Sequence, residues 1–207
     1  MYIVRKGIEY FFPKIDENFM NKVIEILDSD EKKIFLEMVG YDKFHSLEVY
    51  KKLSETTLKN EIIYLKLALL HDCGKGKEKD FLSGKFLYPI KIDKWTQKIL
   101  PVLHSKLGAV IAKEEFHIDD KDILNAIAYH TTGRFKMSDL ECIIYLADMI
   151  EPNRTYPRVE ILREAATKGL YFATLLAMDF SIQYLMELSE MIHPDTIQAR
   201  NTLLEKV

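Results

Sequence analysis

The sequence predicts an all-α protein, a single-domain helical bundle. Apolar residues recur at spacings of three and four along most of the chain, which is the period of an amphipathic helix. The 207 residues contain only eight glycines and six prolines, too few for the closely spaced turns of an all-β protein. The chain shows no internal repeat and no linker-like composition, and its length suits one domain with a sizeable core.

Local start and stop signals place the expected helices along the chain. Pro101 suits the first turn of a helix, and Pro194 suits the start of the last one. Asp120 precedes another helix, and Ser138 with Glu141 three residues later forms a capping box. One or two helices are expected in residues 17–39. Further expected helices cover, in order, residues 43–54, 58–72, 101–116, 119–130 and 138–151, with two or three more in 156–206.

Glycine and proline mark the interruptions between these helices. The first helical segment should end near Gly40, and the apolar helix that follows the next one should stop at Gly74. Residues 76–98 contain Gly84, Pro89 and mixed charges, so we expect a long loop there.

Charge and cysteine content restrict the class of protein. With 29 Lys and Arg against 32 Asp and Glu, the net charge of −3 argues against binding to a nucleic acid polymer, although a basic pocket for one small anion remains open. Cys73 and Cys142 cannot form a disulfide framework, and no signal peptide is visible, so we expect a reducing, cytoplasmic location. Asp179 and Gln183 interrupt the apolar stretch 169–188, so no membrane span is expected. The sequence leaves a homodimer open.

Five ionisable side chains continue the apolar stripes of expected helices. They are His45, Asp72, His104, His130 and Asp148. Val49 and Leu53 follow His45 at four and eight residues, and Asp148 follows Ile144 at four. Because residues at these spacings share one helix face, the five groups should point toward the core.

A shared metal centre accounts for these positions better than separate core residues do. One histidine or aspartate on an apolar face is usually a hydrogen-bonded core residue. Two buried carboxylates without partners would cost several kcal/mol, and a cation removes that cost. His71 lies beside Asp72 at a helix end, so the chain offers four histidines and two aspartates. These donors suit iron, manganese, zinc or cobalt, and their number suits two ions with a bridging carboxylate.

The order of these residues resembles the HD-domain metal-dependent phosphohydrolases. The pair His71-Asp72 followed by Lys75 matches the HDxxK-like core of that superfamily, and the two histidines before the last aspartate are typical of its two-metal branch. The segments HSKLGAVIAKEEF, AIAYHTTGRFKMSDLECIIYLADMIEPNR and YPRVEILREAA closely resemble the bacterial YqeK-type symmetrical diadenosine tetraphosphate hydrolases. Asp42 stands where that family would have an arginine. The resemblance covers roughly residues 43–205.

This resemblance implies a domain plan and a reaction. Residues 1–40 would form a helical extension packed on an HD phosphohydrolase domain of residues 41–207. The domain would cleave diadenosine tetraphosphate to two ADP with a hydroxide activated by two divalent metal ions. Iron is the first candidate, with manganese, cobalt or zinc as alternatives. The implied metal ligands are His45, His71, Asp72, His104, His130 and Asp148.

The same resemblance suggests roles for the groups around the metals. Asp72 is expected to bridge the ions and orient the hydroxide, while Lys75 and Arg134 neutralise the phosphate oxygens during bond breaking. Thr131, Thr132 and Arg154 are further candidates for substrate binding, together with Lys75 and Arg134. Arg154 could equally hold Glu151 in a structural salt bridge.

Two other functions remain open on the sequence alone. One is an HD hydrolase of other nucleotides, such as nucleoside monophosphates or guanosine polyphosphates. The other is a catalytically silent nucleotide sensor, against which the presence of all six ligands argues. The two hydrolases would differ in their products, because only the first releases two ADP.

Overall fold

A computed structural model describes residues 14–55 and 62–207 of this chain. Helices are the only regular secondary structure in these residues. These residues contain α-helices and one short 3₁₀ helix but no strand, so the predicted all-α fold is confirmed. No helix among them is long and apolar enough to cross a membrane. The start of the expected extension and the start of the expected helix 58–72 lie outside the described residues.

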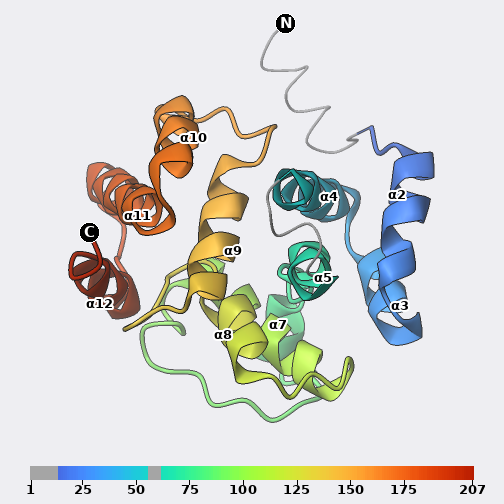
Figure 1. The fold of residues 1–207 in the computed structure, drawn as a ribbon. Coiled ribbons are helices and arrows are strands. Elements are labelled where there is room, and N and C mark those ends of the chain that lie inside the picture. Colours follow the sequence, from blue (N-terminus) through green and yellow to red (C-terminus); the bar gives the residue numbers. More distant parts are fainter. Residues whose placement is uncertain (1–13, 56–61) are drawn as a thin grey trace, which may run out of the picture.

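The helices follow one another with short connections, except between α6 and α7. In chain order they are α2 (Glu17–Val23), the 3₁₀ helix η1 (Ile24–Ile26), α3 (Ser29–Glu37), α4 (Gly40–Ser54), α5 (Ile62–Leu70), α6 (Glu78–Leu82), α7 (Leu100–Glu114), α8 (Lys121–Tyr129), α9 (Asp139–Ile150), α10 (Val159–Lys168), α11 (Leu170–Glu187) and α12 (Pro194–Leu203). Figure 1 shows α2 to α5 on one side of α9 and α10 to α12 on the other.

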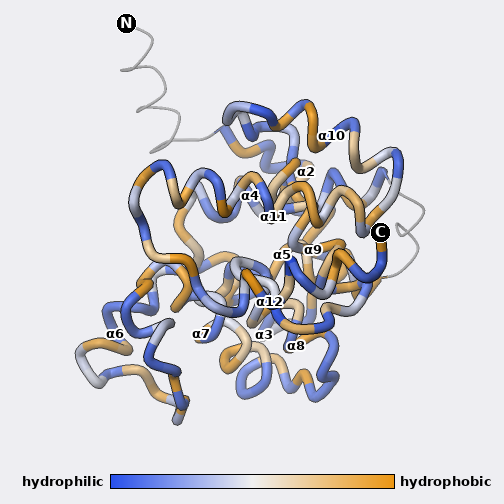
Figure 2. The backbone as a smooth tube through the Cα atoms, turned by 90° about the vertical axis from the view of Figure 1, so that its left-hand side faces the viewer, coloured by the Kyte–Doolittle hydropathy of each residue, from blue (hydrophilic) through white to orange (hydrophobic). Residues whose placement is uncertain are grey.

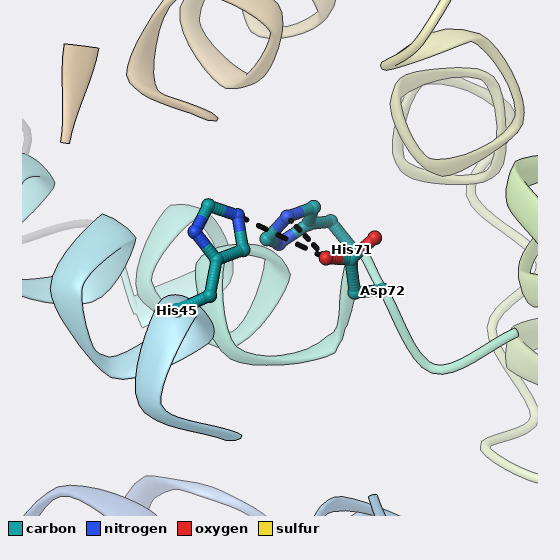
Figure 3. A group of neighbouring side chains, drawn as sticks. All are labelled: His45, His71 and Asp72. Atoms are coloured by element: carbon teal, nitrogen blue, oxygen red, sulfur yellow. Dashed lines mark ion pairs between the residues drawn. The ribbon is translucent and has the colours of Figure 1, made fainter. Parts of the chain in front are cut away.

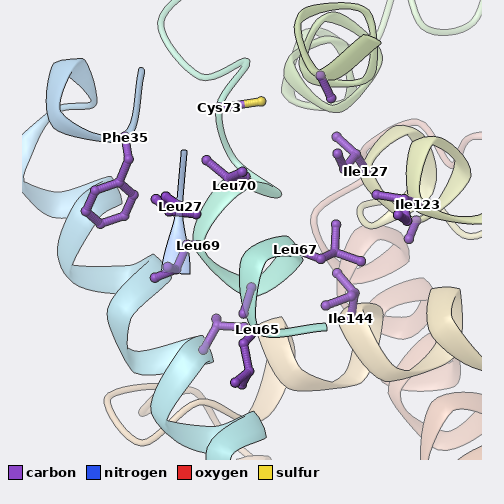
Figure 4. Packing of buried hydrophobic residues seen from close by; sticks show 14 of the residues in the cluster. Leu27, Phe35, Leu65, Leu67, Leu69, Leu70, Cys73, Ile123, Ile127 and Ile144 are labelled. Atoms are coloured by element: carbon purple, nitrogen blue, oxygen red, sulfur yellow. The ribbon is translucent and has the colours of Figure 1, made fainter. Parts of the chain in front are cut away.

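Helix α9 separates two clusters of buried apolar side chains. Ile144 and Ala147 pack into the larger cluster, which α2 to α5, α7 and α8 complete. Tyr145 and Leu146, on the other side of the helix, pack with α10 to α12. Figure 4 shows Ile144 beside Leu67 of α5 in the larger cluster. Because α9 is covered on both sides, its side chains are held firmly between the two halves of the bundle.

Amphipathic patterning and local capping explain most of these boundaries. Hydrophilic and hydrophobic stretches alternate along the helices in Figure 2, as expected for helices with one buried side. The Asp120 carboxylate accepts from the N–H groups of the first turn of α8. Ser138 and Glu141 form the predicted capping box of α9, and Pro101 and Pro194 occupy first turns.

Two boundaries differ from the sequence prediction. Gly40 does not end a helix but begins α4, because the chain already leaves the helical conformation at Met38 and Val39. The expected loop 76–98 contains α6, a five-residue helix that buries none of its residues. A helix without a buried side leaves no apolar period in the sequence, which is why it was not predicted.

Candidate metal centre

Six ionisable side chains meet where the helices of the larger cluster converge. His45 comes from α4, His71 and Asp72 directly follow α5, His104 lies on α7, His130 directly follows α8, and Asp148 lies on α9. All are nearly buried except Asp148, whose side chain is 19% exposed. The centre therefore opens toward solvent at Asp148.

Asp72 occupies the middle of this group, with its two carboxylate oxygens facing different histidines. Oδ1 lies 3.2 Å from Nε2 of His104 and 3.3 Å from Nε2 of His130. Oδ2 lies 3.4 Å from Nε2 of His71 and 3.8 Å from Nε2 of His45, as Figure 3 shows. One carboxylate thus faces two sets of nitrogen donors, one set at each oxygen.

Asp148 completes one side of the group. Its Oδ1 atom lies 2.8 Å from Nε2 of His45. One ligand atom each from His71, His130 and Asp148 also lie within 4.8 Å of one another. The six side chains therefore form one connected cluster rather than two distant sites.

Backbone carbonyl groups fix the orientation of two histidine rings. Nδ1 of His71 lies 2.9 Å from the carbonyl oxygen of Ala68, and Nδ1 of His130 lies 2.8 Å from that of Ile127. Because a carbonyl oxygen only accepts, Nδ1 must carry the proton in both rings. Nε2 of each ring then faces Asp72, and a second ring nitrogen held by a carbonyl group is usual for a metal-binding imidazole.

Burial and the neighbouring charges set the protonation of the cluster. Burial lowers the pKa of His71 to about 4, so this ring is neutral at pH 7. Burial would raise the pKa of Asp72 and of Asp148, but the surrounding histidines and cationic side chains hold both well below the usual range. Burial would likewise lower the pKa of His45, but Asp148 and Glu151 raise it to about 9.

The residues present fit a pair of divalent metal ions. Nε2 of His71 and Oδ1 of Asp72 are buried without a hydrogen-bond partner. Such atoms are costly in a folded protein unless a cation or water satisfies them. Imidazole nitrogen and carboxylate oxygen together suit iron, manganese, cobalt or zinc.

A close contact between two segments brings Asp72 to α7. A Cβ atom on Gly74 would lie 2.1 Å from the carbonyl oxygen of His104 and 2.4 Å from the backbone nitrogen of Gly108. Only glycine allows this approach. The turn after α5 therefore lies directly against α7, opposite His104.

Lys75 and Arg154, two of the predicted substrate-binding residues, lie at the cluster. Nζ of Lys75 lies 2.7 Å from Oδ2 of Asp72 and 3.3 Å from Oδ1 of Asp42. Nη2 of Arg154 lies 2.5 Å from Oδ1 of Asp148, and its Nε donates to the Asp148 carbonyl group. Two cationic groups therefore flank the centre near its open side.

The other three predicted substrate-binding residues form their hydrogen bonds outside the cluster. Arg134 donates from Nε and Nη2 to the two carboxylate oxygens of Glu141, at 2.6 and 2.9 Å. The hydroxyl of Thr131 lies 3.2 Å from that of Ser105, and the buried Thr132 donates to the carbonyl group of the next residue. These three side chains lie near His130 in the sequence but make no hydrogen bond to the cluster.

Two further acidic residues lie at the site, outside the expected ligands and substrate-binding residues. Glu151 is buried, and its Oε1 lies 3.6 Å from both Nδ1 of His45 and Nε of Arg154. Asp42 holds Lys75 from the opposite side. Glu151 follows Asp148 by three residues, and Asp42 precedes His45 by three. Residues at this spacing share one side of a helix, and this spacing is the signal in the sequence that places the two acidic residues at the site.

Comparisons with known proteins identify the family. The HD domain model matches residues 44–153, a span that contains all six side chains of the cluster. The symmetrical bis(5'-nucleosyl)-tetraphosphatase of Halalkalibacterium halodurans is 40% identical over 141 residues, covering 66% of this chain and 73% of that protein. The Bacillus subtilis protein of the same name is 33% identical over 163 residues, covering 77% of this chain and 83% of that protein.

A solved structure agrees with this relationship. The crystal structure of a predicted HD superfamily hydrolase involved in NAD metabolism from Clostridium acetobutylicum superposes with a TM-score of 0.69. The alignment covers 94% of this chain and 99% of that one, at 30% identity. Fold, the order of the six side chains and relatives all agree, and the chain belongs to the HD domain family.

Proposed function

We propose that this chain hydrolyses diadenosine tetraphosphate symmetrically, giving two ADP, at a centre for two divalent transition-metal ions. The relatives named symmetrical bis(5'-nucleosyl)-tetraphosphatases support the substrate and the reaction. The position of Asp72 carries the two-metal part of the proposal. One of its oxygens faces His104 and His130, and the other faces His71 and His45.

The ligands divide naturally between the two ions. His45, His71, Asp72 and Asp148 would hold one ion, and Asp72, His104 and His130 would hold the other. When bound, such ions lower the pKa of water toward about 7 and offset the charge of the phosphates. We take iron as the first candidate, and manganese, cobalt and zinc suit the same donors.

The side chains around the metals have separate roles in this proposal. Asp72 orients the attacking water, because it lies between both sets of histidines. Lys75 neutralises the charge that develops on the phosphate oxygens, since its ammonium group lies 2.7 Å from Asp72. Arg154 binds a neighbouring phosphate beside Asp148.

Arg134 and Thr131 belong to the proposal as more distant phosphate contacts, whereas the Thr132 side chain, buried and donating to the Gly133 carbonyl group, is left with a supporting position beside them. The Arg134 side chain is 29% exposed while its guanidinium is paired with Glu141, so it can meet an anion without giving up that pair. Thr131 lies next to His130 and can donate its hydroxyl to a phosphate oxygen.

We place this activity in the cytoplasm. Cys73 and Cys142 are both buried and free, as is usual for proteins of a reducing compartment. The division of the chain into an extension of residues 1–40 and a catalytic domain of residues 41–207 is part of the same proposal. The HD domain match begins at residue 44, which supports it.

Product analysis tests the proposed reaction. Purified protein would be loaded with manganese, cobalt or iron and given a panel of nucleotides, with the products separated by ion-exchange chromatography. We expect diadenosine tetraphosphate to be cleaved to two ADP faster than any mononucleotide is hydrolysed, and Asp72→Asn to abolish the reaction. ATP plus AMP would place the metals at an end phosphate. Activity on nucleoside monophosphates or guanosine polyphosphates alone would assign the chain to another HD hydrolase.

A further inference from the structure

The connection between α6 and α7 exposes large apolar side chains that the bundle does not bury. Leu87 in its middle is 83% exposed, and Leu82 at the end of α6 is 61% exposed. Trp95 and Leu100, toward its other end, are also exposed. Figure 2 shows the region around α6 projecting from the rest of the molecule. Exposed apolar side chains that are concentrated in one short segment indicate an interaction surface.

Four lysines lie among these apolar side chains, and none of them forms an ion pair with a carboxylate in the described part of the chain. All four are exposed: Lys85, Lys91, Lys94 and Lys98. The segment 82–100 contains one acidic residue, Asp93, although the whole chain carries a net charge of −3. Positive charge is therefore concentrated on this segment, while the rest of the chain is acidic.

The turn that carries Trp95 is held in one shape. The Asp93 carboxylate accepts from the backbone N–H groups of Trp95 and Thr96, at 2.8 and 3.1 Å. Thr96 is buried, and its hydroxyl lies 3.2 Å from Nε2 of His193, the residue that caps α12. The one carboxylate of the segment is therefore engaged within the turn, and α12 anchors that turn.

Two of the lysines flank the indole ring of Trp95. Nζ of Lys94 lies 5.3 Å from the centre of the ring, and Nζ of Lys98 lies 5.8 Å from it. Cation–π attraction favours these positions of the ammonium groups. A tryptophan with ammonium groups around it matches the boundary of a membrane, where indole rings lie at the level of the headgroups and lysines contact anionic lipids.

We propose that residues 82–100, the basic loop, bind the surface of a membrane that contains anionic lipids. Leu87 and Trp95 enter the headgroup region, and the four lysines contact the anionic headgroups. Such an attachment is reversible, because it combines a small apolar area with a few charges. The inference does not depend on the proposed function, since the basic loop supplies no residue to the metal cluster.

The kind of exposed side chain favours a lipid surface over a single-stranded nucleic acid. Proteins that bind single strands stack successive bases on several aromatic rings. Here the Phe86 ring packs edge-on against those of Phe81 and Tyr88, with ring centres 6.5 and 5.8 Å apart. Trp95 is thus the exposed ring of the basic loop, and the other exposed apolar side chains are leucines. Leucine does not stack on a base, but it gains free energy when it leaves water for lipid.

Fluorescence of Trp95 tests the inference directly, because this residue is the only tryptophan of the chain. The full-length protein would be titrated with vesicles of phosphatidylcholine that contain about 30% phosphatidylserine, and with vesicles of phosphatidylcholine alone. We expect the emission maximum to move to shorter wavelength with the anionic vesicles, because the indole ring leaves water. Added salt should weaken this binding, since ions screen the charge of the lysines.

Variants separate the contributions of charge and apolar surface. Cosedimentation with the anionic vesicles would measure the partition coefficient. Replacing Lys94 and Lys98 together by Gln should lower it about 25-fold, at about 5-fold for each lysine. Leu87→Ala should lower it about 10-fold, and this side chain is too exposed for the change to affect folding. Lys168→Gln and Ile161→Ala on α10, exposed and far from α6 in Figure 2, are the matched controls and should change it less than about 2-fold.

Several outcomes would overturn the membrane surface. These are no binding to anionic vesicles at low salt, equal binding to the neutral vesicles, or a partition coefficient that the loop variants leave unchanged. Binding of a labelled single-stranded RNA instead of vesicles, lost in the double lysine variant, would assign the basic loop to nucleic acid. Cleavage of diadenosine tetraphosphate is measured separately, so failure of the proposed reaction and failure of this inference are distinguishable.

Discussion

Asp72 is the residue on which the geometry of the centre depends. Its carboxylate is only 2% exposed and lies within 3.8 Å of all four histidines. Its position directly after α5 places it at the convergence of α4, α7 and α8 rather than on one helix surface. A carboxylate in this position is stable only with cations around it, which Lys75 and the proposed metals supply.

Replacing Lys75 tests how catalysis is divided among the side chains. Lys75→Ala should lower the turnover of diadenosine tetraphosphate about 10²-fold or more, because its ammonium group would stabilise charge only in the transition state. Metal content should stay normal, since the lysine is not a ligand. Lys79→Ala, an exposed position of the same segment, is the control. A parallel loss of bound metal would instead assign Lys75 a structural role through its pair with Asp72.

The sequence predicts that the side chains of the centre point toward the core, but it does not predict the distances between them. Helical periodicity places His45 and His104 on apolar faces, and both side chains are buried. The packing of the helices decides which rings meet, and the hydrophobic periodicity of a single helix does not predict that packing. The pairing of Glu151 with His45 and of Asp42 with Lys75 arises in the same way, from contacts between different segments.

Among the helices, the contact between the end of α5 and α7 sets the shape of the site. Gly74 allows backbone atoms of the two segments to meet, and Cys73 donates from Sγ to the carbonyl oxygen of Gly108 in the same contact. This contact is what brings Asp72 within 3.2 Å of His104. A small residue in a turn therefore controls the distance between two proposed metal ligands.

Gly74→Ala should destabilise the protein by about 3 kcal/mol or more, because the new Cβ would overlap backbone atoms that cannot rotate away. Chemical unfolding with urea would measure the change in the free energy of unfolding. Gly169→Ala is the matched control: nothing lies within 4 Å of its Cβ position, and it should change stability by less than about 0.5 kcal/mol. Equal stability of the two variants would mean that the α5–α7 contact can relax.

Helix boundaries were predictable where a side chain caps its own helix. The Asp120 cap, the Ser138–Glu141 box and Pro194 act within one turn, so the local sequence contains them fully. A helix does end near Gly40, as predicted, but Gly40 itself begins α4 because the chain leaves the helical conformation at Met38 and Val39.

Across the whole described bundle, the six side chains join segments that are distant in the sequence. Helices α4, α5, α7, α8 and α9 each contribute to the centre, directly or from the residue that follows them. Metal ions bound there would link all five helices at once. Binding to the folded chain alone must then raise its stability, since an unfolded chain does not assemble the six ligands.

Removing the metals should therefore lower the thermal stability of the whole protein. We expect chelation to lower Tm by about 5–10 °C. This shift corresponds, in a chain of this size, to a free metal concentration about 100 times the Kd of the site before chelation. Differential scanning calorimetry before chelation, after chelation and after adding manganese back would measure it. His130→Ala, which removes one proposed ligand, should show a smaller shift. An identical Tm with and without chelator would contradict the coupling between metal binding and folding.

The metal-to-protein ratio tests the central claim of a two-metal centre most directly. Elemental analysis of freshly purified protein, and of protein reconstituted with manganese, iron, cobalt or zinc, should find two transition-metal ions per chain. His130→Ala and Asp148→Ala, one proposed ligand from each side of Asp72, should each lower that ratio. A wild-type chain that holds no iron, manganese, cobalt or zinc even after reconstitution would contradict the centre described here.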